Sequence, residues 1–141
     1  MRKGFTLLEL SMATVLLGLM VLVALPALGA WRDRGAVRLA TSELMAFYHA
    51  ARHSALVRGT RVRVSLGEDS FEAAFEGVDD STFLVRPGPA AHGVALVASR
   101  RVFRIHPNGL GRAGANATLV LRRGQAAESL TTSRLGRLRR W

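Results

Sequence analysis

Arginine is the residue type with the clearest chemical potential in this sequence. The chain has 141 residues and a formal net charge of +10, and its cations are 19 arginines and the single lysine, Lys3. Ten arginines follow residue 99, where the only acid is Glu128, so this segment carries a net charge of +9. A guanidinium stays charged and binds phosphate through paired N–H donors. The segment therefore predicts a polyanionic partner; the alternative is a solvated surface that partly neutralises the acidic residues 66–85.

Arginines are most densely clustered at the end of the chain, where Arg137, Arg139 and Arg140 follow one another within four residues. If residues 138–141 form a strand, Arg137 and Arg139 share one face while Leu138 shares the other face with Arg140. A glycine before them permits a tight turn, and Trp141 can stack on a base or a guanidinium. We predict a DNA-binding surface made of Arg134, Gly136, Arg137, Arg139 and Arg140. The alternative is that these arginines prevent an edge strand from pairing with another sheet.

A second chemical feature is one acid at the start of a long apolar run. No residue from Leu10 to Trp31 is ionisable, and about 20 apolar residues span a bilayer core. Arg2 and Lys3 precede the run, which predicts a cytoplasmic N-terminus and an exported remainder. Glu9 costs about 2.5–3.5 kcal/mol within such a span and therefore needs a partner. Two alternative interpretations of this run are a secretory signal peptide cleaved after Ala30 and a plain membrane anchor.

The sequence predicts neither an enzyme nor a cofactor. It has no cysteine, no serine in a Gly-x-Ser-x-Gly context, and no glycine pattern of the phosphate-binding or dinucleotide-binding type. His49 and His53 have the spacing of a metal-binding pair on a helix, but no third ligand lies nearby in the sequence. We therefore expect a polar helix face there and no metal site.

The periodicity of the chain predicts an α+β fold. Apolar residues recur at three- and four-residue spacing from Val37 to Ala55, so one long helix, with a possible kink, is expected from Phe5 to Arg58 and is stopped by Gly59. Alternating residues then predict a small antiparallel β-sheet domain packed against the second half of the helix. Its expected strands are 61–66, 71–76, 82–86, 94–98, 101–106, 117–122, 128–132 and 138–141.

The N-terminal residues resemble a known processing signal. The order Gly4-Phe5-Thr6-Leu7-Leu8-Glu9 ahead of a long apolar span is similar to the class III signal of type IV pilins and type II secretion pseudopilins, and Pro26 also fits this family. The resemblance implies that a prepilin peptidase cuts after Gly4 and that the new terminal residue, Phe5, is methylated. It also implies that Glu9 pairs with the terminal amine of a neighbouring subunit during filament assembly.

The rest of the chain resembles the GspH/FimT branch of this family. The resemblance is carried by residues 102–109, 118–121 and 133–139, and this branch commonly ends in Gly-Arg-x-Arg, as at residues 136–139. It implies a leader at 1–4, a transmembrane and assembly helix at 5–30, and an exported domain at 31–141. The expected location is the bacterial inner membrane before assembly, and the periplasm or pilus afterwards.

Two functions follow from this resemblance. The first is a FimT-like minor type IV pilin whose basic C-terminus binds double-stranded DNA, without sequence specificity, for uptake in natural transformation. The second is a GspH-like minor pseudopilin of a type II secretion system that does not bind DNA. Both functions imply prepilin peptidase, other pilin or pseudopilin subunits and the inner membrane as partners. The arginine-rich terminus separates the two, because secretion does not require it.

Overall fold

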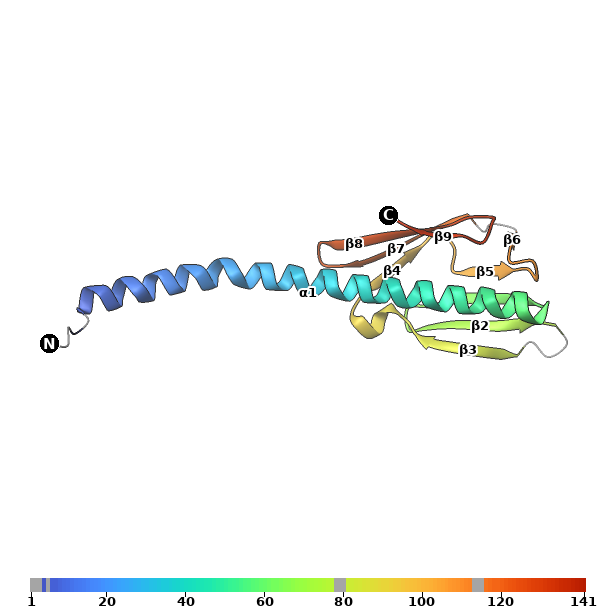
Figure 1. Cartoon of the computed structure of the whole chain (residues 1–141), viewed down its shortest axis with the longest axis horizontal. Helices are drawn as coiled ribbons and strands as arrows, with labels where there is room; N and C mark the ends of the chain where they lie inside the picture. Colours follow the sequence, from blue (N-terminus) through green and yellow to red (C-terminus); the bar gives the residue numbers. More distant parts are fainter. Residues whose placement is uncertain (1–3, 5, 78–80, 113–115) are drawn as a thin grey trace. The chain divides into compact units, whose positions relative to one another are not determined.

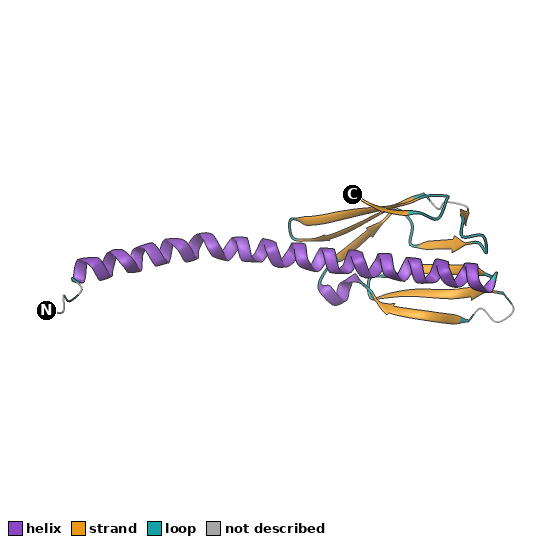
Figure 2. Cartoon of the chain, viewed as in Figure 1, coloured by secondary structure: helices purple, strands orange, loops and turns teal. Residues whose placement is uncertain are grey.

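The computed structural model describes residues 4, 6–77, 81–112 and 116–141 and divides the chain into two compact units, Met1–Arg32 and Asp33–Trp141. Asp33–Trp141 is called the C-terminal unit below. Figures 1 and 2 show a long helix followed by short strands. In chain order the elements are α1 (Leu7–Arg58), β1 (Arg61–Leu66), β2 (Ser70–Glu76), β3 (Thr82–Pro87), η1 (Pro89–His92), β4 (Ala95–Ala98), β5 (Val102–Ile105), β6 (Gly111–Arg112), β7 (Ala117–Arg123), β8 (Ala126–Thr132) and β9 (Leu138–Arg140).

The first part of α1 is apolar, and its residues from Leu7 to Gly29 are exposed. Thr6 caps the helix, because its Oγ1 accepts a hydrogen bond from the backbone N–H of Glu9 at 3.2 Å. Threonine followed three residues later by glutamate is the sequence pattern of a capping box, but among the described residues no hydrogen bond to the Glu9 carboxylate accompanies it. Pro26 lies inside α1 without ending it. Within the described residues, α1 is long and apolar enough to cross a membrane.

The second part of α1 packs on the sheets through the face that its periodicity predicts. Eight residues of this part are buried: Val37, Ala40, Thr41, Leu44, Phe47, Tyr48, Ala51 and Ala55. Thr41 is the polar exception, and its Oγ1 donates a hydrogen bond to the carbonyl oxygen of Val37 at 2.8 Å. The helix ends at Arg58, and Gly59 follows in the left-handed conformation with φ +60°. The predicted stop is therefore confirmed, because glycine takes this conformation without steric cost.

The strands form two antiparallel sheets that share one core with α1. The first has the order β3-β2-β1-β5-β6 and the second the order β4-β7-β8-β9. Phe71, Val64 and Ile105 from the first sheet and Leu96, Leu119 and Leu130 from the second are among the core residues, which are at most 5% exposed. The antiparallel α+β fold is thus confirmed, and its division into two sheets is a feature that alternation alone did not predict.

The differences from the predicted elements are local. The expected strand at 101–106 is shorter, at Val102–Ile105, and the last strand ends at Arg140 instead of Trp141. A two-residue strand, Gly111–Arg112, lies where a loop was expected, and a 3₁₀ turn, Pro89–His92, follows the proline-rich break. The expected turn at 77–80 and the loop at 114–116 extend outside the described residues.

Candidate nucleic-acid interface

The predicted basic site is built on the hairpin turn between β8 and β9. Thr132 pairs with Leu138, the N–H of Gly136 donates to Ser133 O at 2.9 Å, and the N–H of Ser133 donates to Arg137 O at 2.9 Å. Gly136 has φ +67°, so it supplies the left-handed residue that such a hairpin loop needs. The turn places Arg134 at its tip and Arg137 immediately before β9, and both residues are exposed.

The hairpin turn sits directly against the loop that ends β5. A side chain at Gly136 would place its Cβ 2.2 Å from the carbonyl oxygen of Gly109, so only glycine permits this approach. The N–H of Gly111 donates to Arg134 O at 3.0 Å, and the N–H of Arg134 donates to Asn116 Oδ1 at 3.2 Å. The loop at 106–109 and the Gly-Arg-x-Arg ending, which carried the family resemblance separately, therefore meet in the folded chain.

Arg52 of α1 holds this loop in place. Its Nε donates a hydrogen bond to Gly109 O at 3.0 Å, across 57 positions in the sequence. The loop itself is closed by a hydrogen bond from the N–H of Gly109 to His106 O at 2.8 Å and by one from the N–H of Leu110 to Asn108 Oδ1 at 3.1 Å. The helix thus positions the loop, and the loop positions the hairpin. Sequence reasoning did not assign this role to Arg52, because nothing local to residue 52 indicates it.

Three of the predicted arginines carry uncompensated charge. Arg134, Arg137 and Arg139 are exposed, and no acidic side chain of the described residues forms an ion pair with them. Other arginines in the basic segment are paired: Arg101 with Glu68 at 2.8 Å and Arg104 with Glu76 at 2.7 Å. The free positive charge of the hairpin is therefore concentrated at its turn and on β9.

Arg140 differs from the other three. Its Nη2 donates to Oε1 of Glu128, which also lies 4.0 Å from Nε of Arg38 on α1. The Glu128 side chain is only 15% exposed, and within the described chain its Oε2 has no hydrogen-bond partner. Arg140 shares the face of Leu138, as strand alternation predicts, and its charge is partly neutralised there. Its pairing with Glu128 weakens the case for a phosphate contact at this position.

The predicted N-terminal site lies at the start of α1. Gly4 is exposed, and Phe5 lies outside the described residues. Glu9 is exposed in the first turn, and no ion pair involves its carboxylate within the described chain. A carboxylate at this position also interacts favourably with the N-terminal end of the helix. The predicted roles of Gly4, Phe5 and Glu9 in processing and assembly remain predictions.

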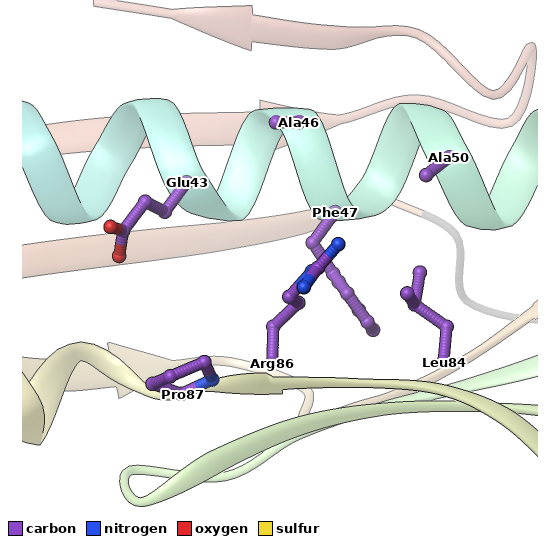
Figure 3. Close-up of a pocket in the computed structure, with 7 residues that line it drawn as sticks. All are labelled: Glu43, Ala46, Phe47, Ala50, Leu84, Arg86 and Pro87. Atoms are coloured by element: carbon purple, nitrogen blue, oxygen red, sulfur yellow. The ribbon is translucent and has the colours of Figure 1, made fainter.

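Other candidate features of the C-terminal unit offer little chemistry. A cavity of about 540 Å³ between α1 and β3 is lined by alanine, phenylalanine, leucine and proline side chains with two charged residues, Glu43 and Arg86 (Figure 3). Glu43 accepts a 2.8 Å contact from His92 Nε2 when the imidazole carries that proton. Within the described residues no group of three or more His, Cys, Asp or Glu side chains is placed to hold a metal ion, and His49 and His53 lie exposed on α1.

Glu76 is the acid most strongly engaged by arginines. It lies on β2, and its Oε1 accepts hydrogen bonds from Nε of Arg104 at 2.7 Å and from Nε of Arg63 at 3.3 Å. Partial burial raises the pKa of this carboxyl group, but the two guanidinium groups outweigh burial and hold the pKa below its usual value. Elsewhere, burial raises the pKa of the Tyr48 hydroxyl, against a smaller lowering by the charge of Arg52.

The architecture defines the class of protein. The first part of the N-terminal helix is apolar and exposed, and its second part packs on antiparallel sheets. This is the architecture of a pilin-like subunit. The chain also matches the family described as type II transport protein GspH over residues 40–136, which is more than half of its length. It therefore belongs to the GspH family, and it is a minor pilin or pseudopilin. The matched range ends at Gly136, so β9 and Trp141 lie beyond it.

The chain also has a clear likeness to solved structures. A crystal structure of the type IV minor pilin FimU from Pseudomonas aeruginosa PAO1 has a TM-score of 0.64 and 15% identity, covering 75% of this chain and 88% of that one. A second crystal form of FimU gives a TM-score of 0.61 and 14% identity, with 74% and 91% covered. At these identities the likeness shows the fold. No curated protein sequence matches the chain significantly. The family and the fold predicted from the sequence are both confirmed.

Proposed function

We propose that this protein is a minor type IV pilin that binds DNA through the β8–β9 hairpin for uptake in natural transformation. The observation that carries the proposal is the cluster of Arg134, Arg137 and Arg139, which are exposed and have no acidic partner within the described chain. Guanidinium groups in this state are available for paired contacts to phosphate. Phosphate contacts carry no base information, so binding to duplex DNA is non-specific.

The route to this role begins at the membrane. Prepilin peptidase cuts between Gly4 and Phe5, Phe5 is methylated, and α1 anchors the subunit in the bacterial inner membrane with its N-terminus in the cytoplasm. Glu9 then pairs with the terminal amine of a neighbouring pilin, and the subunit leaves the membrane for the filament. The exposed apolar first part of α1 and membership of the GspH family support these steps.

The second candidate function is a minor pseudopilin of a type II secretion system. The family description, type II transport protein, favours it as directly as the likeness to FimU favours a pilus. Deleting the gene in its native host separates the two, because loss of transformation with normal secretion supports the pilus and the reverse supports secretion.

The direct test of the DNA role is salt-dependent binding. The full chain in uncharged detergent micelles should bind duplex DNA with a dissociation constant of about 10⁻⁴–10⁻⁶ M at physiological salt. Three phosphate contacts predict a slope of about −2.7 for log K against log salt, from roughly −0.9 per contact. Replacing Arg137 and Arg139 with glutamine should reduce the slope to about −0.9 and weaken binding, as measured by fluorescence anisotropy.

A matched control comes from the other sheet. Arg61 on β1 and Arg86 on β3 are also exposed and have no ion pair with a described acid, so Arg61→Gln with Arg86→Gln removes equal charge elsewhere. Arg63 is less suitable because it pairs with Glu76. Equal losses from both double variants would indicate general electrostatic attraction without a site. If replacing Arg137 and Arg139 does not weaken DNA binding, their remaining role is to prevent the edge strand β9 from pairing with another sheet, and the secretion function is favoured.

A further inference from the structure

The sheet β4-β7-β8-β9 has one face in the core and one face open to solvent. Strand alternation and register place Leu96, Leu119 and Leu130 on the core face. The residues of the opposite face, called the outer face here, share exposure or half-burial and the lack of negative charge. They are Ala95, Val97, Thr118, Val120, Arg122, Ala127, Ser129, Thr131, Arg139 and Trp141. A polyanion therefore meets no acidic side chain among the described residues of this face.

Trp141 is the largest side chain of the outer face. Its backbone N–H donates to Ser129 O at 2.9 Å, which continues the β8–β9 ladder by one residue. Its indole Nε1 donates to Thr131 Oγ1 at 3.1 Å, so the polar atom of the ring is satisfied within the protein. The residue nevertheless remains 73% exposed. An indole that is held in place and open to solvent has a free π-face, which is what a stacking partner requires.

Two arginines flank this ring on the same face. Arg139 precedes it by two residues on β9, and Arg122 lies on β7, two strands away. Arg139 lies opposite Thr131 and Arg122 lies opposite Ala127, on strands separated by β8. At about 3.3 Å per residue and about 4.8 Å between strands, the Cα atoms of the two arginines are roughly 16 Å apart. Neither arginine has an acidic partner within the described chain. By register Ser129 on β8 lies between them, and Thr131, whose hydroxyl accepts from the indole, lies beside Arg139.

We propose that the outer face binds single-stranded DNA, with a base stacked on Trp141 and the backbone held by Arg139 and Arg122. The proposal rests on the proposed DNA-binding function and adds the form of DNA that the site prefers. Bases of a duplex are stacked within the helix, so a duplex reaches only the arginines, whereas an unpaired strand also offers base faces to the indole. The combination of a positively charged surface with an aromatic platform is the physical basis of single-strand binding.

The test compares two probes on the full chain in uncharged detergent micelles. One probe is a fluorescein-labelled oligothymidylate of about 12 nucleotides, a length within known site sizes, and the other is a blunt duplex of the same length. We expect tighter binding of the single strand at equal salt. Trp141→Ala should weaken single-strand binding about tenfold, in the range reported for loss of one stacked base, and should change duplex binding less than about twofold. Trp141→Phe should recover most of the loss, because phenylalanine retains a ring but not the N–H.

Two controls make the result specific to the outer face. Leu135→Ala removes an exposed apolar side chain from the hairpin turn, outside the outer face, and should leave both affinities unchanged. In a Trp31→Phe background Trp141 is the single tryptophan, and its fluorescence should be quenched by the oligothymidylate and not by the duplex. Circular dichroism of each variant verifies that the fold is retained.

The outcomes separate the two proposals. Equal affinity for both probes, equal losses from Trp141→Ala on both, or failure of Trp141→Phe to recover binding would overturn the single-strand proposal. Duplex binding that still depends on Arg137 and Arg139 would then leave the proposed function intact. Absence of binding to either probe would overturn both proposals.

Discussion

Gly136 is the residue on which the candidate interface depends most directly. It combines a left-handed backbone with a close approach to the carbonyl oxygen of Gly109, and each of these requires the absence of a side chain. Because that carbonyl oxygen also accepts the hydrogen bond from Arg52, the contact connects the hairpin to α1. In the family pattern Gly-Arg-x-Arg, the glycine therefore allows the turn to pack against the loop at Gly109, and the two arginines that follow remain exposed to solvent.

Replacing Gly136 with alanine should destabilise the C-terminal unit more than the same change at Gly59. Both glycines have positive φ, +67° and +60°, so each variant loses about 1–2 kcal/mol to backbone strain. At Gly59 nothing lies within 4 Å of an added Cβ, whereas at Gly136 backbone atoms of Gly109 must shift. Such overpacking costs about a further 1–3 kcal/mol. Urea unfolding measures both, and equal losses would show that the turn moves away from Gly109 at little cost.

At the scale of elements, Glu76 links three strands of the first sheet. It lies on β2 and contacts Arg63 on β1 and Arg104 on β5, so one carboxylate spans two strand pairs. The Glu76 side chain is 17% exposed, while those of Arg63 and Arg104 are 38% and 63% exposed. Water thus screens the arginine side of the network more than the acid side. The contribution of such partly exposed pairs is modest, about 1 kcal/mol or less.

Glu76→Gln should therefore change the pH dependence of stability. The lowered pKa in the folded state means that the unfolded chain binds this proton more readily, so the carboxylate stabilises the fold above about pH 4.3 and loses this effect as the pH falls through the folded-state value. We expect the variant to be less stable than the natural chain at pH 7, by about 1 kcal/mol or less, and equally stable once the pH lies below the folded-state pKa of Glu76. Glu72→Gln is the control, because Glu72 is an exposed acid on the same strand and forms no ion pair with an arginine of the described residues. A stability difference that stayed constant with pH would contradict this role.

Elements with a strong local pattern were predictable, and contacts between distant elements were not. The helix face from Val37 to Ala55 follows from spacing alone, and alternation located most strands within two residues. The division into two sheets depends on which strands pair, and alternation contains no information about pairing. The contact of Arg52 with Gly109 joins residues 57 positions apart, so no local signal indicates it. The pairing of Arg140 with Glu128 was missed for the same reason.

At the scale of the whole molecule, the acidic and basic segments neutralise each other unevenly. Glu68 and Glu76 of the acidic segment pair with Arg101 and Arg104 of the basic one, as the solvated-surface alternative requires. Asp33 pairs with Arg123 at 3.0 Å, and Glu128 takes up Arg140. These pairs leave Arg134, Arg137 and Arg139 of the hairpin without an acidic partner among the described residues. The net charge of +10 is thus less informative than the place where it remains uncompensated.

At the scale of the filament, two substitutions of Glu9 test whether its charge is needed for assembly. The Thr6-x-x-Glu9 pattern suggests one role for the Glu9 side chain, accepting a hydrogen bond from the backbone N–H of Thr6 in a capping box, and the family resemblance gives it another, pairing with a neighbour's terminal amine. Glutamine can serve in a capping box but carries no charge, whereas alanine serves neither role. If the charge is what matters, Glu9→Gln and Glu9→Ala should both reduce filament incorporation by about an order of magnitude or more, since one close ion pair of low solvent exposure is lost.

Membrane insertion and processing are the internal controls for these variants. Both substitutions make the apolar segment less costly to insert, so membrane fractions should contain as much of each variant as of the natural chain. Intact mass should show loss of residues 1–4 and one added methyl group, whereas a mature N-terminus at Trp31 would indicate a secretory signal instead. Filament incorporation is measured by quantifying the subunit in sheared filaments. Incorporation of Glu9→Gln at the natural level, with Glu9→Ala defective, would show that Glu9 acts as a helix cap and would remove the ion pair from the assembly mechanism.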